Sequence, residues 1–265
     1  MSLVLEIDDY TSGDLAMPII SPYPRLGDGS LFLGEFSRTV TWADLAVAPA
    51  DGDPFGNIAE AQADALLGAG NYAGLFSDPA GGQLSFSPGG GVRMRANNGL
   101  RVSLGTAFNA YCAANPWLLV FWFRVSEIAD DTSIRYLLDP WGGTFLHLRT
   151  TADPGGIDNL LTAQVRGANV STGSASVAVN ALTQFALDST GKAYINGAQV
   201  GSSAPGSTAI AEALAFRSDN DWDGTNPLTL YRVHLLNPTA SGVTALQEVQ
   251  ADYAYAQGRP WWTTA

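Results

Sequence analysis

The residues best suited to metal chemistry lie in one short acidic stretch, Asp219-Asn-Asp221-Trp-Asp223-Gly224. Oxygen ligands at alternate positions followed by a glycine match the start of a calcium-binding loop. A helix-loop-helix calcium site in its usual form is ruled out, because Leu230 stands at the twelfth position, where a bidentate glutamate is needed. Two interpretations stay open: a looser calcium site on Asp219, Asp221 and Asp223, or a solvated acidic hairpin loop that ends in an Asp-Gly turn. No other cofactor is indicated.

Three aromatic residues in loop-like surroundings are candidates for ligand binding: Trp141, Trp222 and Tyr111. An aromatic ring in a loop can stack on a sugar ring, since it offers a large apolar face beside a polar edge. The same residues could instead cap the ends of a β structure. The sequence leaves both roles open.

Hydrolytic chemistry finds little support in the sequence. A glycosidase usually needs two carboxylates that flank the scissile bond, but the glutamates of this chain are scattered. His147 and His234 each fall in a strand-like pattern without a nearby serine or cysteine motif, so we interpret both as packed side chains. Neither G-x-S-x-G nor H-E-x-x-H occurs, and Gly89-Gly-Gly91 lacks the following Lys-Ser/Thr of a phosphate loop. We therefore predict no catalytic residues and no enzymatic activity.

Composition limits the classes of protein and partner. The chain has 265 residues, of which only 14% are charged and 29 are glycine, which favours one large all-β unit with many turns. The net charge of −12 argues against nucleic acid as a partner, because no basic stripe is present to neutralise phosphates. Cys112 is the only cysteine, so no internal disulfide can form. No apolar run approaches the roughly twenty residues of a membrane helix, and we expect no membrane insertion.

The elements that would position these residues are mostly short strands. The run from Pro116 to Val125 is apolar on both faces and predicts a central strand buried on both sides, in preference to a sugar-binding platform. Alternation of apolar and polar residues predicts further strands at 31–36, 38–42, 84–86, 92–95, 100–104, 134–138, 144–149, 161–166 and 228–236. Helical patterns are expected at 57–67, with a stop at Gly68, and at 239–255.

The stretch from Thr183 to Ser202 predicts tight antiparallel turns. Asn196-Gly197 is the dipeptide favoured in two-residue hairpin loops, where both central residues need a positive φ. Tyr194 and Ile195 before the turn, and Val200 after it, are residues that favour strands.

These segments together resemble a concanavalin A-like jelly roll of the laminin-G type. Tyr194-Ile-Asn-Gly and Val200-Gly are similar to a hairpin that this family carries, and the 116–125 run is similar to the strand that opens its main sheet. A late strand at 228–236 and a short helix after it follow in the family's order. The resemblance covers about residues 70–255. It implies an all-β antiparallel β-sandwich with a short C-terminal helix, surface or carbohydrate recognition, and, as in some members, calcium near the binding edge.

The first sixty residues differ from the rest. Prolines interrupt them repeatedly, and short strand patterns lie between the prolines. We predict an N-terminal extended arm or small β module at 1–60 and the sandwich at 61–265. An arm would dock on a neighbouring subunit; the alternative is that this region supplies the first strands of the sandwich.

The start of the chain lacks the basic region and long apolar core of a secretory signal. Bacteriophage virion proteins assemble in the host cytoplasm and need no such signal. By this analogy we predict a non-enzymatic virion structural protein of a tail or capsid surface. Its partners would be other virion proteins, copies of itself and host-surface glycans. The alternatives are a glycan-active enzyme of the jelly-roll class and a cellular or extracellular carbohydrate-binding module for adhesion.

Overall fold

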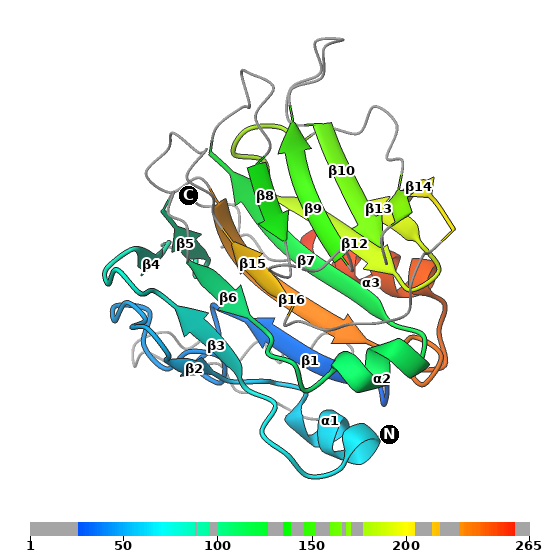
Figure 1. Cartoon of the computed structure of the whole chain (residues 1–265), viewed down its shortest axis with the longest axis horizontal. Helices are drawn as coiled ribbons and strands as arrows, with labels where there is room; N and C mark the ends of the chain where they lie inside the picture. The colour runs from blue at the N-terminus through cyan, green and yellow to red at the C-terminus, as the bar shows by residue number, and fades with distance from the viewer. Residues whose placement is uncertain are drawn as a thin grey trace, which may run out of the picture.

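The computed structural model describes residues 26–87, 89–95, 100–126, 135–138, 146–151, 160–165, 168–170, 177–204, 214–217 and 228–257. These residues form two antiparallel sheets that face each other, with three short helices around them (Figure 1). The predicted fold class is confirmed: the described residues form an all-β, antiparallel β-sandwich with a short C-terminal helix. In the part of the chain that is described, every helix is too short or too polar to cross a membrane.

Each sheet has eight strands within the described residues. The first sheet, called sheet A here, has the order β14-β13-β12-β7-β16-β5-β4, with β1 also paired to β16. Its strands are β1 (Ser30–Glu35), β4 (Leu84–Phe86), β5 (Val92–Met94), β7 (Leu118–Val125), β12 (Thr183–Asp188), β13 (Lys192–Ile195), β14 (Ala198–Ser202) and β16 (Leu228–Leu236).

The second sheet, sheet B, has the order β11-β10-β9-β8-β15-β6-β3-β2. Its strands are β2 (Pro54–Phe55), β3 (Gly74–Ser77), β6 (Arg101–Ser103), β8 (Arg135–Leu138), β9 (Leu146–Thr151), β10 (Leu160–Val165), β11 (Ala168–Val170) and β15 (Ala215–Arg217). The helices are α1 (Glu60–Leu67), α2 (Asn109–Ala114) and α3 (Ala245–Gln257).

Strand β7 is central and buried along its whole length, as its apolar run predicts. Side chains alternate across a strand, so its residues divide between two environments. Leu119, Phe121 and Phe123 enter the main core, where the Phe121 ring meets Phe216 of sheet B at 4.9 Å between centroids. Leu118, Val120 and Trp122 point to the opposite face, where α3 packs. Strand β7 is apolar at successive positions because the main core covers one of its faces and α3 covers the other.

A β-bulge in β16 places two neighbouring polar-tipped residues on the α3 side. Leu230 pairs with Phe123 and Arg232 with Trp122, so one extra residue, Tyr231, is accommodated in β16. Leu230 and Val233 lie in the main core, whereas Tyr231 packs with Trp122 on the outer face. The bulge therefore shifts the alternation by one residue and turns Arg232 toward α3.

The predicted Asn196-Gly197 hairpin is confirmed. Their φ angles are 48° and 82°, as a two-residue turn with both central residues at positive φ requires, and Ile195 pairs with Ala198 across it. The turn carries β13 back into β14, the edge strand of sheet A.

The range predicted as an arm or small module is described from residue 26 onward. There β1 pairs with β16, and β2 pairs with β3. Asn57 completes the far edge of β1: its Nδ2 donates to the Leu31 carbonyl at 3.0 Å, and its Oδ1 accepts from the Leu33 N–H at 2.9 Å. Because these backbone groups of β1 are already hydrogen-bonded to Asn57, they are not available to pair with another strand. This part of the chain thus pairs with both sheets, and the division at residue 60 stays a prediction.

Two predicted elements differ from the structure. Residues 38–42 form a turn and not a strand, because the N–H groups of Thr41 and Trp42 both donate to the Arg38 carbonyl. Helix α3 begins at Ala245, later than the expected residue 239, because the preceding residues form turns. Thr244 and Gln247 then make a capping box, in which Gln247 N–H donates to Thr244 Oγ1 at 3.2 Å and Thr244 N–H donates to Gln247 Oε1 at 2.9 Å.

Candidate functional site

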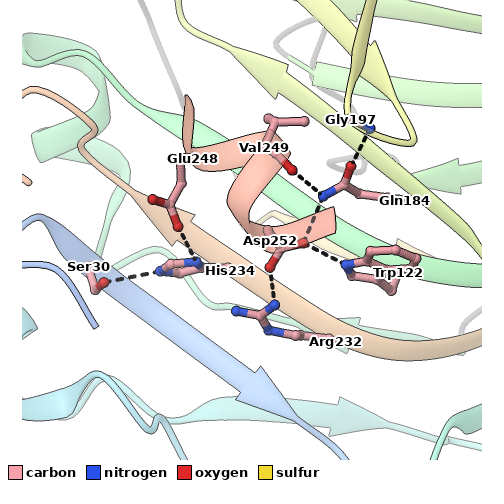
Figure 2. A network of polar contacts seen from close by, with 9 residues as sticks. All are labelled: Ser30, Trp122, Gln184, Gly197, Arg232, His234, Glu248, Val249 and Asp252. Carbon is pink, nitrogen blue, oxygen red and sulfur yellow. Dashed lines mark hydrogen bonds and ion pairs between the residues drawn. The ribbon is translucent and has the colours of Figure 1, made fainter. Parts of the chain in front are cut away.

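The densest group of chemically versatile side chains lies between α3 and the outer face of sheet A (Figure 2). Asp252 of α3 stands at its centre. Its Oδ2 accepts hydrogen bonds from Trp122 Nε1 at 2.6 Å and from Gln184 Nε2 at 2.8 Å, and its Oδ1 forms an ion pair with Arg232. These side chains come from α3, β7, β12 and β16, and all are almost completely buried. A buried carboxylate is tolerated here because several donors and a positive charge replace its water.

Gln184 links this group to the β13–β14 hairpin. Its Nε2 also donates to the Val249 carbonyl at 2.9 Å, and its Oε1 accepts from the Gly197 N–H at 2.9 Å. Its own backbone N–H donates to Asn196 Oδ1. The amide therefore connects the helix to the turn, and each part fixes the position of the other.

Aromatic rings cover the edge of this polar group. The Tyr253 ring stacks on Trp122 with 5.9 Å between centroids and 7° between planes. The Arg232 guanidinium carbon lies 5.3 Å from the centre of the Tyr255 ring, within cation–π range. The rings exclude water, which strengthens the charge interactions beneath them.

A second set, Ser30, His234 and Glu248, has the residue types of a nucleophilic triad. Ser30 Oγ and His234 Nε2 share a hydrogen bond of 3.1 Å, and Glu248 Oε1 lies 4.0 Å from His234 Nδ1 (Figure 2). Burial, together with the Arg232 charge, holds the pKa of His234 well below its usual value of 6.5, so the imidazole is neutral. A neutral imidazole is the form that a general base needs.

The surroundings of this set do not suit acyl transfer. Ser30 and His234 are 0% and 1% exposed, so no substrate carbonyl can reach the hydroxyl without opening the structure. The 4.0 Å separation between Glu248 and His234 is too long for the hydrogen bond that orients the base in a working triad. In this arrangement the Ser30–His234 hydrogen bond joins β1 to β16, and Glu248 of α3 lies beside the imidazole without a hydrogen bond to it.

Of the aromatic and acidic residues predicted to bind ligands, the structure describes only Tyr111. Tyr111 is not in a loop: it lies on α2, is half-buried against the main core, and its hydroxyl accepts a hydrogen bond from Asn237 Nδ2 at 2.8 Å. Trp141, Trp222, Asp219, Asp221 and Asp223 lie outside the described residues. Within the described ranges, no group of three His, Cys, Asp or Glu side chains could hold a metal ion.

His147 and His234 both lie on strands, β9 and β16, as predicted. The group around Asp252 was not predicted from the sequence. A signal was present, because Arg232 and His234 interrupt an apolar strand pattern at alternate positions, and Glu248 and Asp252 lie four residues apart on the helix. Buried polar side chains are almost always hydrogen-bonded, so polar residues at positions expected to be buried predict polar partners beside them.

No protein-family model matches the sequence, and no curated protein matches it. Solved structures do match. The binding domain of botulinum neurotoxin serotype C1 overlaps with a TM-score of 0.57 at 9% identity, over 87% of this chain and 53% of that one. A Trypanosoma rangeli sialidase overlaps with a TM-score of 0.56 at 11% identity, over 86% of this chain and 33% of that one. The chain thus spans about half of the toxin domain and a third of the sialidase, and at these identities the likeness concerns the fold.

Proposed function

We propose that this chain is a recognition module that binds glycans and catalyses no reaction on them. The observation that carries the proposal is the two-sheet sandwich, which overlaps toxin domains described as binding domains. One similar structure, botulinum neurotoxin type C, is described as interacting with two ganglioside molecules to enter cells, with a TM-score of 0.55 at 10% identity. A sandwich of this kind supplies a rigid frame for loops that contact a ligand.

The buried groups support recognition over catalysis. Of the described residues, the set closest to a catalytic triad is Ser30, His234 and Glu248, and it is closed to substrate. Asp252 is occupied by donors from the sheet, so it is not poised to exchange a proton with a ligand. These side chains use their hydrogen-bonding capacity to hold the fold together.

The setting in which such a module would act is a separate proposal. A virion surface, with host glycans as ligands, fits an acidic chain with a single cysteine. In such a particle, repeated copies would raise the avidity of weak sugar binding.

A glycan array on the purified protein, after its mass in solution has been measured, tests the proposal. We expect selective binding to a subset of glycans and no release of sugar from the bound ones over several hours. A well-folded protein that binds no glycan would refute the proposal. Release of sugar that disappears in Ser30→Ala would replace it by an enzymatic function.

A further inference from the structure

The tight turn between β13 and β14 has a chemical weakness that comes with its sequence. Asn196 and Gly197 both have a positive φ, and Asn-Gly is the dipeptide that suits such a turn best. In the same dipeptide the backbone nitrogen after the asparagine reaches the side-chain amide most easily, because glycine has no side chain to hinder it. Asn196 is exposed, so water and hydroxide can reach it. The shape that the fold requires is therefore made with a thermolabile asparagine.

Deamidation of this pair needs only water. The Gly197 nitrogen gives up its proton and attacks Asn196 Cγ, so that a new N–C bond forms. The C–N bond of the side-chain amide breaks, and its nitrogen leaves as ammonia with that proton. Water then opens the cyclic imide at either carbonyl, which yields aspartate or isoaspartate. Both products add a negative charge, and isoaspartate also lengthens the backbone of the turn by a carbon atom.

Gln184 of β12 holds both reacting groups of this turn. The Gly197 N–H donates to Gln184 Oε1 at 2.9 Å (Figure 2), and the Gln184 N–H donates to Asn196 Oδ1 at 2.9 Å. The Asn196 N–H donates in turn to the Gln184 carbonyl at 3.1 Å. The attacking nitrogen thus keeps its proton, because without it the nitrogen would face the lone pairs of Oε1. The carbonyl that would be attacked is fixed toward β12.

The Gln184 amide has only one favourable orientation. Its Nε2 donates to the Val249 carbonyl at 2.9 Å and to Asp252 Oδ2 at 2.8 Å, and the side chain is 0% exposed. A flipped amide would place its NH2 group against the Gly197 N–H and its oxygen against two acceptors. The Tyr253 ring also lies over the turn, since a Cβ on Gly197 would be 3.3 Å from Tyr253 Cδ1. Helix α3 therefore fixes the group that holds the turn.

We propose that Asn196 is a deamidation site that Gln184 keeps unreactive in the folded protein. Local opening of the turn breaks the contact between Gly197 and Gln184 and allows the nitrogen to attack. The reaction then weakens the docking of α3, because isoaspartate displaces the Gly197 N–H from the amide that also holds the helix. Copies that have reacted differ permanently from new ones in how firmly α3 is held on sheet A.

Peptide mapping by mass spectrometry, after incubation of the full chain at mildly alkaline pH, measures the reaction at Asn196. In urea, Asn196 and Asn98 should react at similar rates, because both are followed by glycine, and they give the rate without protection. In the folded protein Asn196 should react at least about tenfold more slowly than in urea, because the hydrogen bonds to Gln184 must open first and each contributes a factor of about five.

Two variants show which contact protects the turn. Gln184→Met removes the acceptor for the Gly197 N–H and should raise the rate at Asn196 in the folded chain by about fivefold or more. Asp252→Asn is the matched control: it also weakens the attachment of α3, but the Val249 carbonyl still orients the Gln184 amide, and the rate should stay close to that of the unaltered chain. Circular dichroism at the incubation temperature checks that both variants are folded.

The products provide a further measurement. Anion exchange separates the reacted protein through its added charge, and this form should melt at a lower temperature than the unreacted form. Equal melting of the two forms would overturn the link between the turn and α3.

The rates decide the rest of the inference. Equal rates at Asn196 in the folded protein and in urea would overturn it, and this comparison needs no variant. Equal acceleration in Gln184→Met and Asp252→Asn would also overturn it, because general loosening of α3, and not the Gln184 contact, would then control the reaction. These outcomes are independent of glycan recognition, which the array tests separately.

Discussion

Replacing Asp252 by asparagine is the sharpest test of how α3 is held. The carboxylate accepts from Trp122, Gln184 and Arg232, and the Arg232 side chain is only 2% exposed. Asparagine keeps the shape but removes the charge opposite Arg232 and turns one NH2 group toward a donor. Breaking a buried ion pair by removing one partner costs about 3–5 kcal/mol, because the other charge stays buried without compensation.

Urea unfolding, followed by tryptophan fluorescence and far-UV circular dichroism, measures this cost. A loss of about 3–5 kcal/mol corresponds to a fall in melting temperature of roughly 6–10 °C for a chain of this size. Glu60→Gln, which removes an exposed carboxylate from α1, serves as the control and should change stability by less than about 0.5 kcal/mol. The two variants remove the same charge from the chain, so net charge cannot explain a difference.

A second substitution tests the cause. In Arg232→Met/Asp252→Asn neither charge of the pair remains, and the asparagine oxygen can still accept from Trp122 or Gln184. We expect the double variant to regain about 1–3 kcal/mol relative to Asp252→Asn alone. A loss of less than about 1 kcal/mol in Asp252→Asn, or losses that simply add in the double variant, would refute the view that Arg232 and Asp252 are a coupled, desolvated pair.

Three further predictions follow from the same structure. The pKa of His234 is lowered on folding, so the unfolded chain binds more protons than the folded chain below pH 6.5. The free energy of unfolding should therefore fall by up to about 1.4 kcal/mol as the pH drops from 6.5 to 5.5. Urea titrations at several pH values measure this, and in His234→Gln the free energy of unfolding should depend less steeply on pH. Gly197→Ala should lower stability in thermal melting by about 1–2 kcal/mol, at least as much as Gly52→Ala, because both glycines have φ near 82°. Only at Gly197 would the new Cβ also meet a side chain, Tyr253 Cδ1 at 3.3 Å, so a smaller cost at Gly197 would contradict this reasoning. Millimolar calcium should raise the melting temperature relative to EDTA, and Asp221→Asn should abolish the rise, whereas equal melting in both buffers would rule out a calcium site at Asp219, Asp221 and Asp223.

Local patterns predicted much of the fold. The run at 116–125 indicated a central strand because only a strand covered on both faces is apolar at successive positions. Asn196-Gly197 indicated the hairpin because few other dipeptides adopt two positive φ angles in succession. Each of these signals depends on neighbouring residues, so it is present in the sequence itself.

Partners distant in the sequence could not be predicted. Tyr111 was expected in a loop, and nothing local showed that α2 would bring its hydroxyl to Asn237, 126 positions away. Likewise, the bulge at Tyr231 shifts the alternation of β16, and the sequence pattern alone does not say on which side Arg232 emerges. Register is decided by the pairing of whole strands, and a shift of one residue exchanges the two faces.

The sequence by itself determined the central strand, the hairpin and the presence of a C-terminal helix, because each follows from the periodicity or turn chemistry of adjacent residues. The sandwich class was implied by the resemblance of the ordered segments to a known family. Only the tertiary structure decided that Asp252 meets Trp122 and Gln184, and that Ser30 meets His234. These groupings join residues that are far apart along the chain. They exist because backbone pairing across several strands brings the side chains together, and no local pattern encodes that pairing.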